Sequence, residues 1–191
     1  MCHACCSAGH TVTNNDACIF RLAAIRIVSA AVRSTRINLG YIDVLQMHYI
    51  LSAGWNTELS DYMTAFDKLK QKGVIRAHGL SCHALAALET AVGEPWTDAI
   101  HVRINPYGIN MDDSAEKVEP VVRQLHEAGR GVIAMKVLGE GALANSDEQR
   151  DQSFRYVLQL GAVDLMTVGM IKISDIIDTE ERIRKVPLVK S

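Results

Sequence analysis

Short runs of apolar, β-branched residues alternate with longer segments of helical spacing through most of the chain. The short runs begin near Tyr41, Val74, Ala99, Val132 and Val163, so that successive starts lie 33, 25, 33 and 31 residues apart. A strand followed by a covering helix occupies about 30 residues, and this rhythm therefore predicts five successive βα units that feed one parallel sheet. The runs are nearly continuous in apolar residues, which is typical of strands that helices cover on at least one face.

The segments between the strands carry start and stop signals of helices. We expect Thr57, Ser114, Ser146 or Asp147, and Ser174 to begin helices, because hydroxyl and carboxylate side chains accept hydrogen bonds from the first free N–H groups. Glycine tolerates the left-handed conformation that often ends a helix, and Gly73, Gly129 and Gly161 stand at the expected positions. The predicted helices therefore cover residues 58–72, 83–92, 115–128, 147–160 and 174–186, and one further helix precedes the first strand.

Composition and charge exclude several classes of protein. The chain has 191 residues, is 48% hydrophobic and 22% charged, and has a formal net charge of −2, as in an ordinary soluble domain. No basic block is present to hold a phosphate backbone, so we expect no nucleic acid partner. The longest apolar stretch runs only from Ala84 to Leu88, against the roughly 18 residues of a membrane span. A complete (β/α)₈ barrel needs about 250 residues, more than this sequence contains.

The first residues differ from the rest of the chain. Four of the five cysteines fall at positions 2, 5, 6 and 18, and only Cys2 and Cys5 have the spacing of a zinc knuckle. We expect no metal site, a disordered leader over residues 1–16, and a domain over residues 17–191. Residues 17–37 contain arginines but no acidic residue, which is similar to an organelle transit peptide; we favour a helix of the domain and a reducing, cytoplasmic location.

Polar residues stand where each predicted strand ends. In parallel α/β sheets ligands bind at the carboxyl ends of the strands, so these residues are the candidates for chemistry. They are His48, Ser81 with Cys82 and His83, Asn105, Lys136 with the glycine loop after it, and Gly169 with Lys172.

The same stretches resemble the aldo/keto reductases. The sequence GYIDVLQMH at 40–48 is similar to the fourth strand of that family, and KGVIRAHGLS at 72–81 to the fifth. Asn105-Pro106-Tyr107 is similar to the end of the sixth strand, GVIAMKVLG at 131–139 to the seventh, and TVGM at 167–170 to the eighth. The resemblance covers about residues 25–186 and implies a partial (β/α)₈ TIM barrel of about five βα units.

The resemblance also implies an activity and a set of site residues. The family reduces aldehydes or ketones with NADPH, so the implied partner is a small-molecule carbonyl substrate, and His48 would orient its carbonyl group. Ser81 would contact the nicotinamide carboxamide, Met135 would pack on the nicotinamide ring, and Lys172 would pair with the 2′-phosphate. The implied cofactor-binding residues are Ser81, Cys82, His101, Met135, Lys136, Leu138, Gly139, Gly141, Gly169 and Lys172.

Three catalytic residues of the family have no counterpart in the part of this chain that the resemblance covers. These Asp, Tyr and Lys residues lie on or after the first three strands, whereas the resemblance begins in the helix before the fourth. Tyr41 cannot replace that tyrosine, because seven strand residues place it roughly 23 Å from His48. We therefore expect an oxidoreductase that is catalytically incomplete as this chain, with weak nucleotide affinity.

Three alternatives remain open from the sequence. The chain could bind a nucleotide without turnover, it could be an inactive truncated barrel, or Lys136 could form a Schiff base as in an aldolase. Five strands of a barrel would leave two open edges, which are pairing hazards unless a helix or a second chain covers them.

Overall fold

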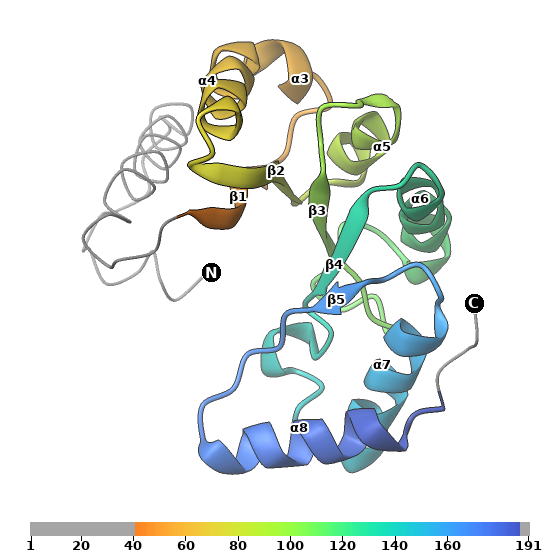
Figure 1. Cartoon of the computed structure of the whole chain (residues 1–191). Helices are drawn as coiled ribbons and strands as arrows, with labels where there is room; N and C mark the ends of the chain where they lie inside the picture. The colour runs from red at the N-terminus through yellow and green to blue at the C-terminus, as the bar shows by residue number, and fades with distance from the viewer. Residues whose placement is uncertain (1–40, 188–191) are drawn as a thin grey trace, which may run out of the picture.

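The computed structural model describes residues 41–187, which form one curved sheet with helices outside it (Figure 1). All five strands are parallel and lie side by side in sequence order. They are β1 (Ile42–Ile50), β2 (Ile75–Cys82), β3 (Ala99–Arg103), β4 (Gly131–Met135) and β5 (Leu165–Met166). The prediction of five successive βα units is confirmed.

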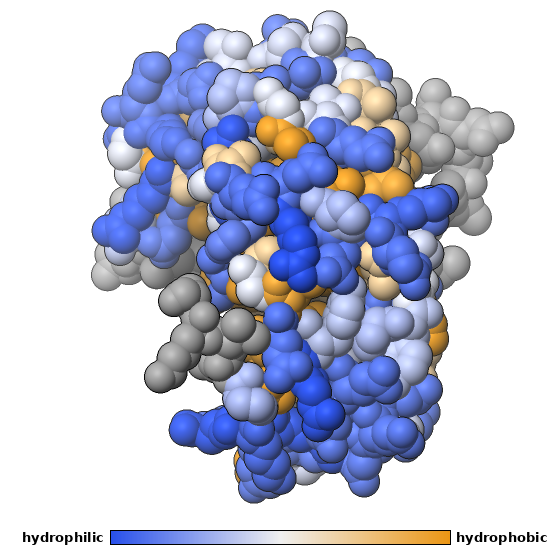
Figure 2. Space-filling model, turned by 90° about the vertical axis from the view of Figure 1, so that its right-hand side faces the viewer, coloured by the Kyte–Doolittle hydropathy of each residue, from blue (hydrophilic) through white to orange (hydrophobic). Residues whose placement is uncertain are grey.

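The helices follow the strands in alternation and form an arc around the outer side of the sheet (Figure 1). This helical side is mostly hydrophilic, with small apolar patches (Figure 2). The helices are α3 (Trp55–Glu58), α4 (Ser60–Gln71), α5 (Leu85–Gly93), α6 (Ala115–Glu127), α7 (Asp147–Gln159) and α8 (Ile173–Lys185), with a short 3-10 turn, η2 (Gly139–Gly141). Gly73, Gly129 and Gly161 have positive φ just after α4, α6 and α7, as predicted.

The expected cap at Thr57 is wrong. Thr57 lies inside α3, and the chain breaks at Leu59 before α4 begins. A tertiary contact explains the earlier helical turn: the fully buried Trp55 donates its indole N–H to the carbonyl of Ala87 at 3.2 Å. This contact fixes the chain two residues before the expected cap.

The other predicted helix starts are close to those of the structure. Ser146 caps α7 and accepts the N–H of Gln149 at 3.3 Å, as expected. At α8 the predicted start at Ser174 is one residue late. Asp175 caps this helix by accepting the backbone N–H groups of Ile171 and Lys172 at 3.0 and 2.9 Å.

The core lies between the outer face of the sheet and the helices. Alternate strand residues such as Leu45 and Met47 point into it, whereas Gln46 and His48 lie on the opposite, inner face. The helices supply fully buried apolar side chains, among them Phe66, Leu88, Val118, Val122, Leu125, Phe154 and Val157.

A partly buried polar cluster joins the middle of β2 to the chain before β3. His78 stacks on Trp96 with ring centroids 4.1 Å apart, and its backbone N–H donates to Asp98 at 3.0 Å. The Trp96 indole donates to Asp67 of α4 at 2.9 Å. These contacts fix the sheet to α4, so that the strands are held in register below the carboxyl edge.

The expected leader over 1–16, the preceding helix and the cysteines at 2, 5, 6 and 18 lie outside the described residues. Within residues 41–187, none of the helices combines the length and the apolar character that crossing a membrane would require. The same part of the chain holds no cluster of three or more histidine, cysteine or carboxylate side chains able to bind a metal ion.

Candidate active site at the carboxyl ends of the strands

The ends of β1, β2 and β4 bring four of the predicted residues together. The rings of His48 and His83 meet edge to face, with centroids 5.3 Å apart. Ser81 Oγ lies 3.2 Å from His83 Nε2 and 3.9 Å from Met135 Sδ. Imidazole, hydroxyl and thioether groups therefore share the inner rim of the sheet.

Tyr49 was not among the candidate residues, yet it completes this cluster through its contact with His83. Their ring centroids lie 4.6 Å apart. Tyr49 has φ +66°, and the pairing of β1 with β2 shifts register between Met47 and Ile50. Such irregularities re-aim side chains and are common beside active sites. The only signal for Tyr49 in the sequence was its position, directly after the predicted His48.

Both histidines of the cluster are neutral near pH 7. Burial, and then the charge of Lys136, hold the pKa of His48 below its ordinary value. Burial lowers the pKa of His83 to about 4, with Arg103 as the next cause. A neutral imidazole has one N–H donor and one acceptor nitrogen, so each ring can orient a polar ligand without carrying charge.

Arg103 supports the cluster from the end of β3. Its Nη2 donates to the carbonyl of His83 at 2.9 Å, and its Nε donates to Asp112 at 2.5 Å. The Asp112 side chain is fully buried; burial raises its pKa, while Arg103 acts in the opposite direction. The pair ties the turn after β2 to the loop after β3.

Cys82 does not reach the rim. Its side chain is fully buried in the core, because neighbouring strand residues point to opposite faces and Ser81 occupies the inner one. Burial, followed by the nearby Asp112, raises the pKa of the thiol to about 12. The thiol therefore stays protonated.

His101 lies on the inner face below the rim. Its Nδ1 is 2.5 Å from Gln46 Oε1, and its Nε2 is 3.2 Å from Thr167 Oγ1. Both ring nitrogens thus have partners within the protein, and the ring links β1 and β3 to the chain after β5. Burial, and then His48, lower its pKa.

The loop after β4 is held in an unusual backbone conformation. Lys136 has φ +59°, and its Nζ forms an ion pair with Glu140. The fully buried Asn105 donates to the carbonyls of Lys136 at 3.0 Å and of Ile109 at 2.7 Å. The predicted Leu138, Gly139 and Gly141 lie in this loop, with Leu138 packed against the core.

The last two predicted residues lie between β5 and α8. A Cβ at Gly169 would have open space around it. Lys172 is exposed, and its backbone N–H donates to Asp175. Both positions flank the start of α8.

The comparisons with known proteins agree with this geometry. The sequence profile of the aldo/keto reductase family matches residues 23–178. The chain belongs to the aldo/keto reductase family. The D-threo-aldose 1-dehydrogenase of a Pseudomonas species is 30% identical over 128 residues, which are 67% of this chain and 38% of the dehydrogenase.

Solved structures give the same fold. The apo form of the aldo-keto reductase AKR11C1 from Bacillus halodurans superposes with a TM-score of 0.68 and 19% identity, over 87% of this chain and 65% of that one. The aldose reductase of Giardia lamblia gives a TM-score of 0.61 and 12% identity, over 84% and 62%. The described residues are therefore a partial (β/α)₈ barrel of an oxidoreductase family. The chain spans less than two thirds of the length of each of these relatives.

Proposed function

We propose that this member of the aldo/keto reductase family is part of an NADPH-dependent oxidoreductase that reduces a small aldehyde or ketone, and that it acts in the cytoplasm. The observation that carries the proposal is the rim cluster. A neutral His48 packs against His83 at the carboxyl ends of a barrel's strands. His83 in turn lies 3.2 Å from the Ser81 hydroxyl, which lies 3.9 Å from the Met135 thioether.

The residues at the rim suit a nicotinamide nucleotide. Ser81 offers a hydroxyl and Met135 an adjacent thioether, which match a carboxamide group and the aromatic ring that bears it. Gly141 has φ +97° with open space around its α-carbon, so a phosphate can approach the backbone there. Lys172 offers an exposed ammonium group to a further phosphate.

Three of the predicted cofactor residues take other roles in this proposal. Cys82 lies in the core and makes no contact with the nucleotide. His101 is bonded at both ring nitrogens and so shapes the inner face. The third residue, Lys136, is paired with Glu140. Gly169 keeps its predicted place beside the cofactor, because it leaves the chain free to pass close to a bound ligand.

His48 orients the substrate rather than protonating it. Its neutral ring can donate one hydrogen bond to a carbonyl oxygen, while NADPH when bound would supply the hydride. A neutral imidazole is a poor acid near neutrality, so the proton must come from another group. By the family resemblance, we expect that group on the first three strands of the barrel, which the resemblance does not cover. We therefore expect nucleotide binding with little turnover from the chain alone.

The substrate class follows from the relative and from the rim. The dehydrogenase of the Pseudomonas species acts, by its name, on a D-threo-aldose. In this chain Tyr49 and His83 flank His48 with a phenol and a neutral imidazole, which can bond to hydroxyl groups. We propose a hydroxylated aldehyde of the sugar type.

The Schiff-base alternative is less well supported. A lysine that attacks a carbonyl must be unprotonated, and the Lys136 ammonium group is engaged by the Glu140 carboxylate. Borohydride should therefore trap no adduct on this lysine.

A fluorescence titration of NADPH tests the proposal. Ser81→Ala should weaken binding about fivefold, because one hydrogen bond contributes about 1 kcal/mol. Ser60→Ala, on the exposed start of α4, is the matched control and should bind as the unmodified chain does. Equal affinities of the two variants, or no binding by the unmodified chain, would refute the cofactor site. Rapid NADPH oxidation with a generic aldehyde would refute the expected incompleteness.

A further inference from the structure

The ion pair of Arg103 and Asp112 lies deeper than an ordinary surface pair. The Asp112 side chain is fully buried, and that of Arg103 is 19% exposed. Asp112 Oδ1 accepts from Arg103 Nε, whereas Oδ2 is buried and has no hydrogen-bond partner among the described residues. A buried carboxylate with an unpartnered oxygen costs stability. The pair therefore indicates a role beyond holding the fold together.

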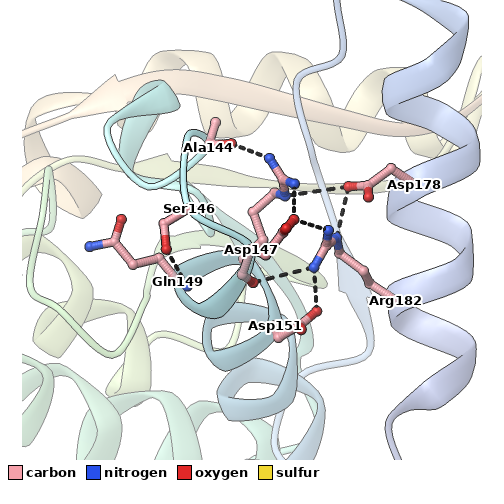
Figure 3. A network of polar contacts seen from close by, with 8 residues as sticks. Ala144, Ser146, Asp147, Gln149, Asp151, Asp178 and Arg182 are labelled. Atoms are coloured by element: carbon pink, nitrogen blue, oxygen red, sulfur yellow. Dashed lines mark hydrogen bonds and ion pairs between the residues drawn. The ribbon is translucent and has the colours of Figure 1, made fainter.

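A second arginine network, between α7 and α8, shows the contrast. Arg182 binds Asp147 and Asp151 of α7 and Asp178 of its own helix (Figure 3). These three carboxylate side chains are 76%, 51% and 39% exposed, so water screens the ion pairs. Arg182 attaches one surface helix to the next, whereas Arg103 reaches the ends of the strands.

Two nitrogens of Arg103 are occupied by groups of the protein. Its Nε is bonded to Asp112, and its Nη2 donates to the backbone carbonyl of His83 at 2.9 Å. A guanidinium presents its donors in a rigid planar fork, so the bond to Asp112 on one side fixes the direction of the bond to His83 on the other. Arg103 is thus placed to act on the candidate site through His83.

His83 passes this constraint to the Ser81 hydroxyl. Ser81 Oγ lies 3.2 Å from His83 Nε2 and 3.9 Å from Met135 Sδ, and it has one proton to donate. An unprotonated ring nitrogen is the better acceptor, because a thioether sulfur accepts weakly. A neutral His83 can accept this proton at Nε2, which leaves the lone pairs of Oγ for an N–H group of a ligand. A protonated His83 donates at both nitrogens, and the Ser81 proton must then turn away from it.

We propose that Arg103 is a positioning residue, which aims the Ser81 hydroxyl at the nicotinamide carboxamide by holding the His83 ring beside it. The contacts run in one series, from Asp112 through Arg103 and His83 to Ser81. The inference rests on the proposed function, in which Ser81 binds the carboxamide group. Arg103 itself makes no contact with the nucleotide in this proposal.

The charge of Arg103 acts on the same ring. Burial, and then this charge, lower the pKa of His83 to about 4, so that the ring is neutral near pH 7. The other groups that act on it are His48 and Lys136, which also lower this pKa, and Glu140, which raises it. Removing the charge of Arg103 should therefore raise the pKa of His83, while the opposed charges of Lys136 and Glu140 stay in place.

The double variant Arg103→Gln/Asp112→Asn tests the link to His83. Arg103→Gln alone would leave a buried, unpaired carboxylate and could unfold the chain, so both charges are removed together. Histidine proton NMR across the acid range would follow the ring. We expect its titration midpoint to rise from about 4 in the unmodified chain toward 6.5 in the double variant, and to stay near 4 in Arg103→Lys, which keeps the charge. An unchanged midpoint in the double variant would overturn the proposal.

A fluorescence titration of NADPH tests whether Arg103 acts through Ser81. We expect the double variant to bind about fivefold more weakly than the unmodified chain, as Ser81→Ala does, because each loses about one hydrogen bond. Adding Ser81→Ala to the double variant should weaken binding no further, since both changes remove the same contact. Independent effects would multiply to about 25-fold. That result would show that Arg103 contacts the nucleotide directly, against the proposal.

Arg76→Gln/Asp43→Asn is the matched control. It removes an exposed arginine and its aspartate partner, 3.1 Å apart near the amino ends of β2 and β1, and should change neither the His83 midpoint nor the affinity for NADPH. If the unmodified chain binds no NADPH, the proposed function fails and the inference fails with it. If the unmodified chain and the Arg103→Gln/Asp112→Asn variant bind NADPH equally well, the inference alone fails.

Discussion

The imidazole of His83 combines two features that decide its chemistry. It bonds to Ser81 at the rim, and burial together with Arg103 lowers its pKa to about 4. Between that value and the ordinary 6.5, the unfolded chain takes up a proton at this residue while the folded chain does not. Folding is therefore progressively destabilised as the pH falls through this interval.

His83→Gln should reduce the sensitivity of the fold to acid. Glutamine can still bond to Ser81 but does not titrate, so the melting temperature should fall less between pH 6.5 and pH 4 than it does for the unmodified chain. Melting curves recorded by circular dichroism across that range would measure the difference. His126→Gln, which replaces a histidine outside the cluster on α6, serves as the control. Parallel pH profiles for the unmodified chain and His83→Gln would contradict this account.

At the scale of single residues, the sequence predicted which polar residues end the strands, and the structure shows how they point. The opposite orientations of Ser81 and Cys82 follow from strand alternation, and that signal was available in the sequence. The direction of the Tyr49 side chain could not be predicted from the sequence, because it depends on the register shift between Met47 and Ile50. The pairing between two strands sets that shift, and it cannot be predicted from the spacing of apolar residues along one strand.

At the scale of elements, β2 and β3 approach closely where their pairing begins. A Cβ placed on Gly79 would lie 1.8 Å from the carbonyl oxygen of Ala99. Backbone atoms cannot move aside as a flexible side chain can, so the strands would have to separate. Glycine is needed here for the approach of two backbones.

Gly79→Ala should destabilise the protein by about 3 kcal/mol, at the upper end of the usual cost of overpacking. Urea unfolding followed by circular dichroism would measure it. Gly93→Ala is the control, because a Cβ at the end of α5 meets nothing within 4 Å; it should change stability by no more than about 0.5 kcal/mol, in the stabilising direction. Equal unfolding midpoints for the two variants would show that the strands do not approach as described.

The order and type of the elements could be predicted from the sequence, but one boundary could not. The helix predicted from Glu58 begins at Trp55 and breaks at Leu59. The cause is the contact of the Trp55 indole with Ala87, 32 positions further along the chain. The 3.6-residue spacing predicted α8 to within one residue, yet could not show that Ile173, Ile176 and Ile177 are exposed.

At the scale of the whole molecule, the five βα units form an arc, and the candidate site lies at the carboxyl ends of its strands. The 30-residue rhythm predicted this arc, because each unit repeats the same right-handed crossover. The exposure of Leu165, Ile173, Ile176 and Ile177 depends on what lies beside β5 and α8, and no periodicity within the chain determines that. The arc thus brings the candidate residues at the strand ends to one edge of the sheet.

The most direct test of a nucleotide site at the carboxyl edge is an amide NMR titration of the chain with NADPH. We expect the largest shifts at Ser81, Met135, Gly139, Gly141 and Lys172, which lie at the strand ends and the loops after them. The amides of His78 and Asp98, below that edge, should shift little. Shifts centred on His78 and Asp98, or no shifts at millimolar NADPH, would contradict the account.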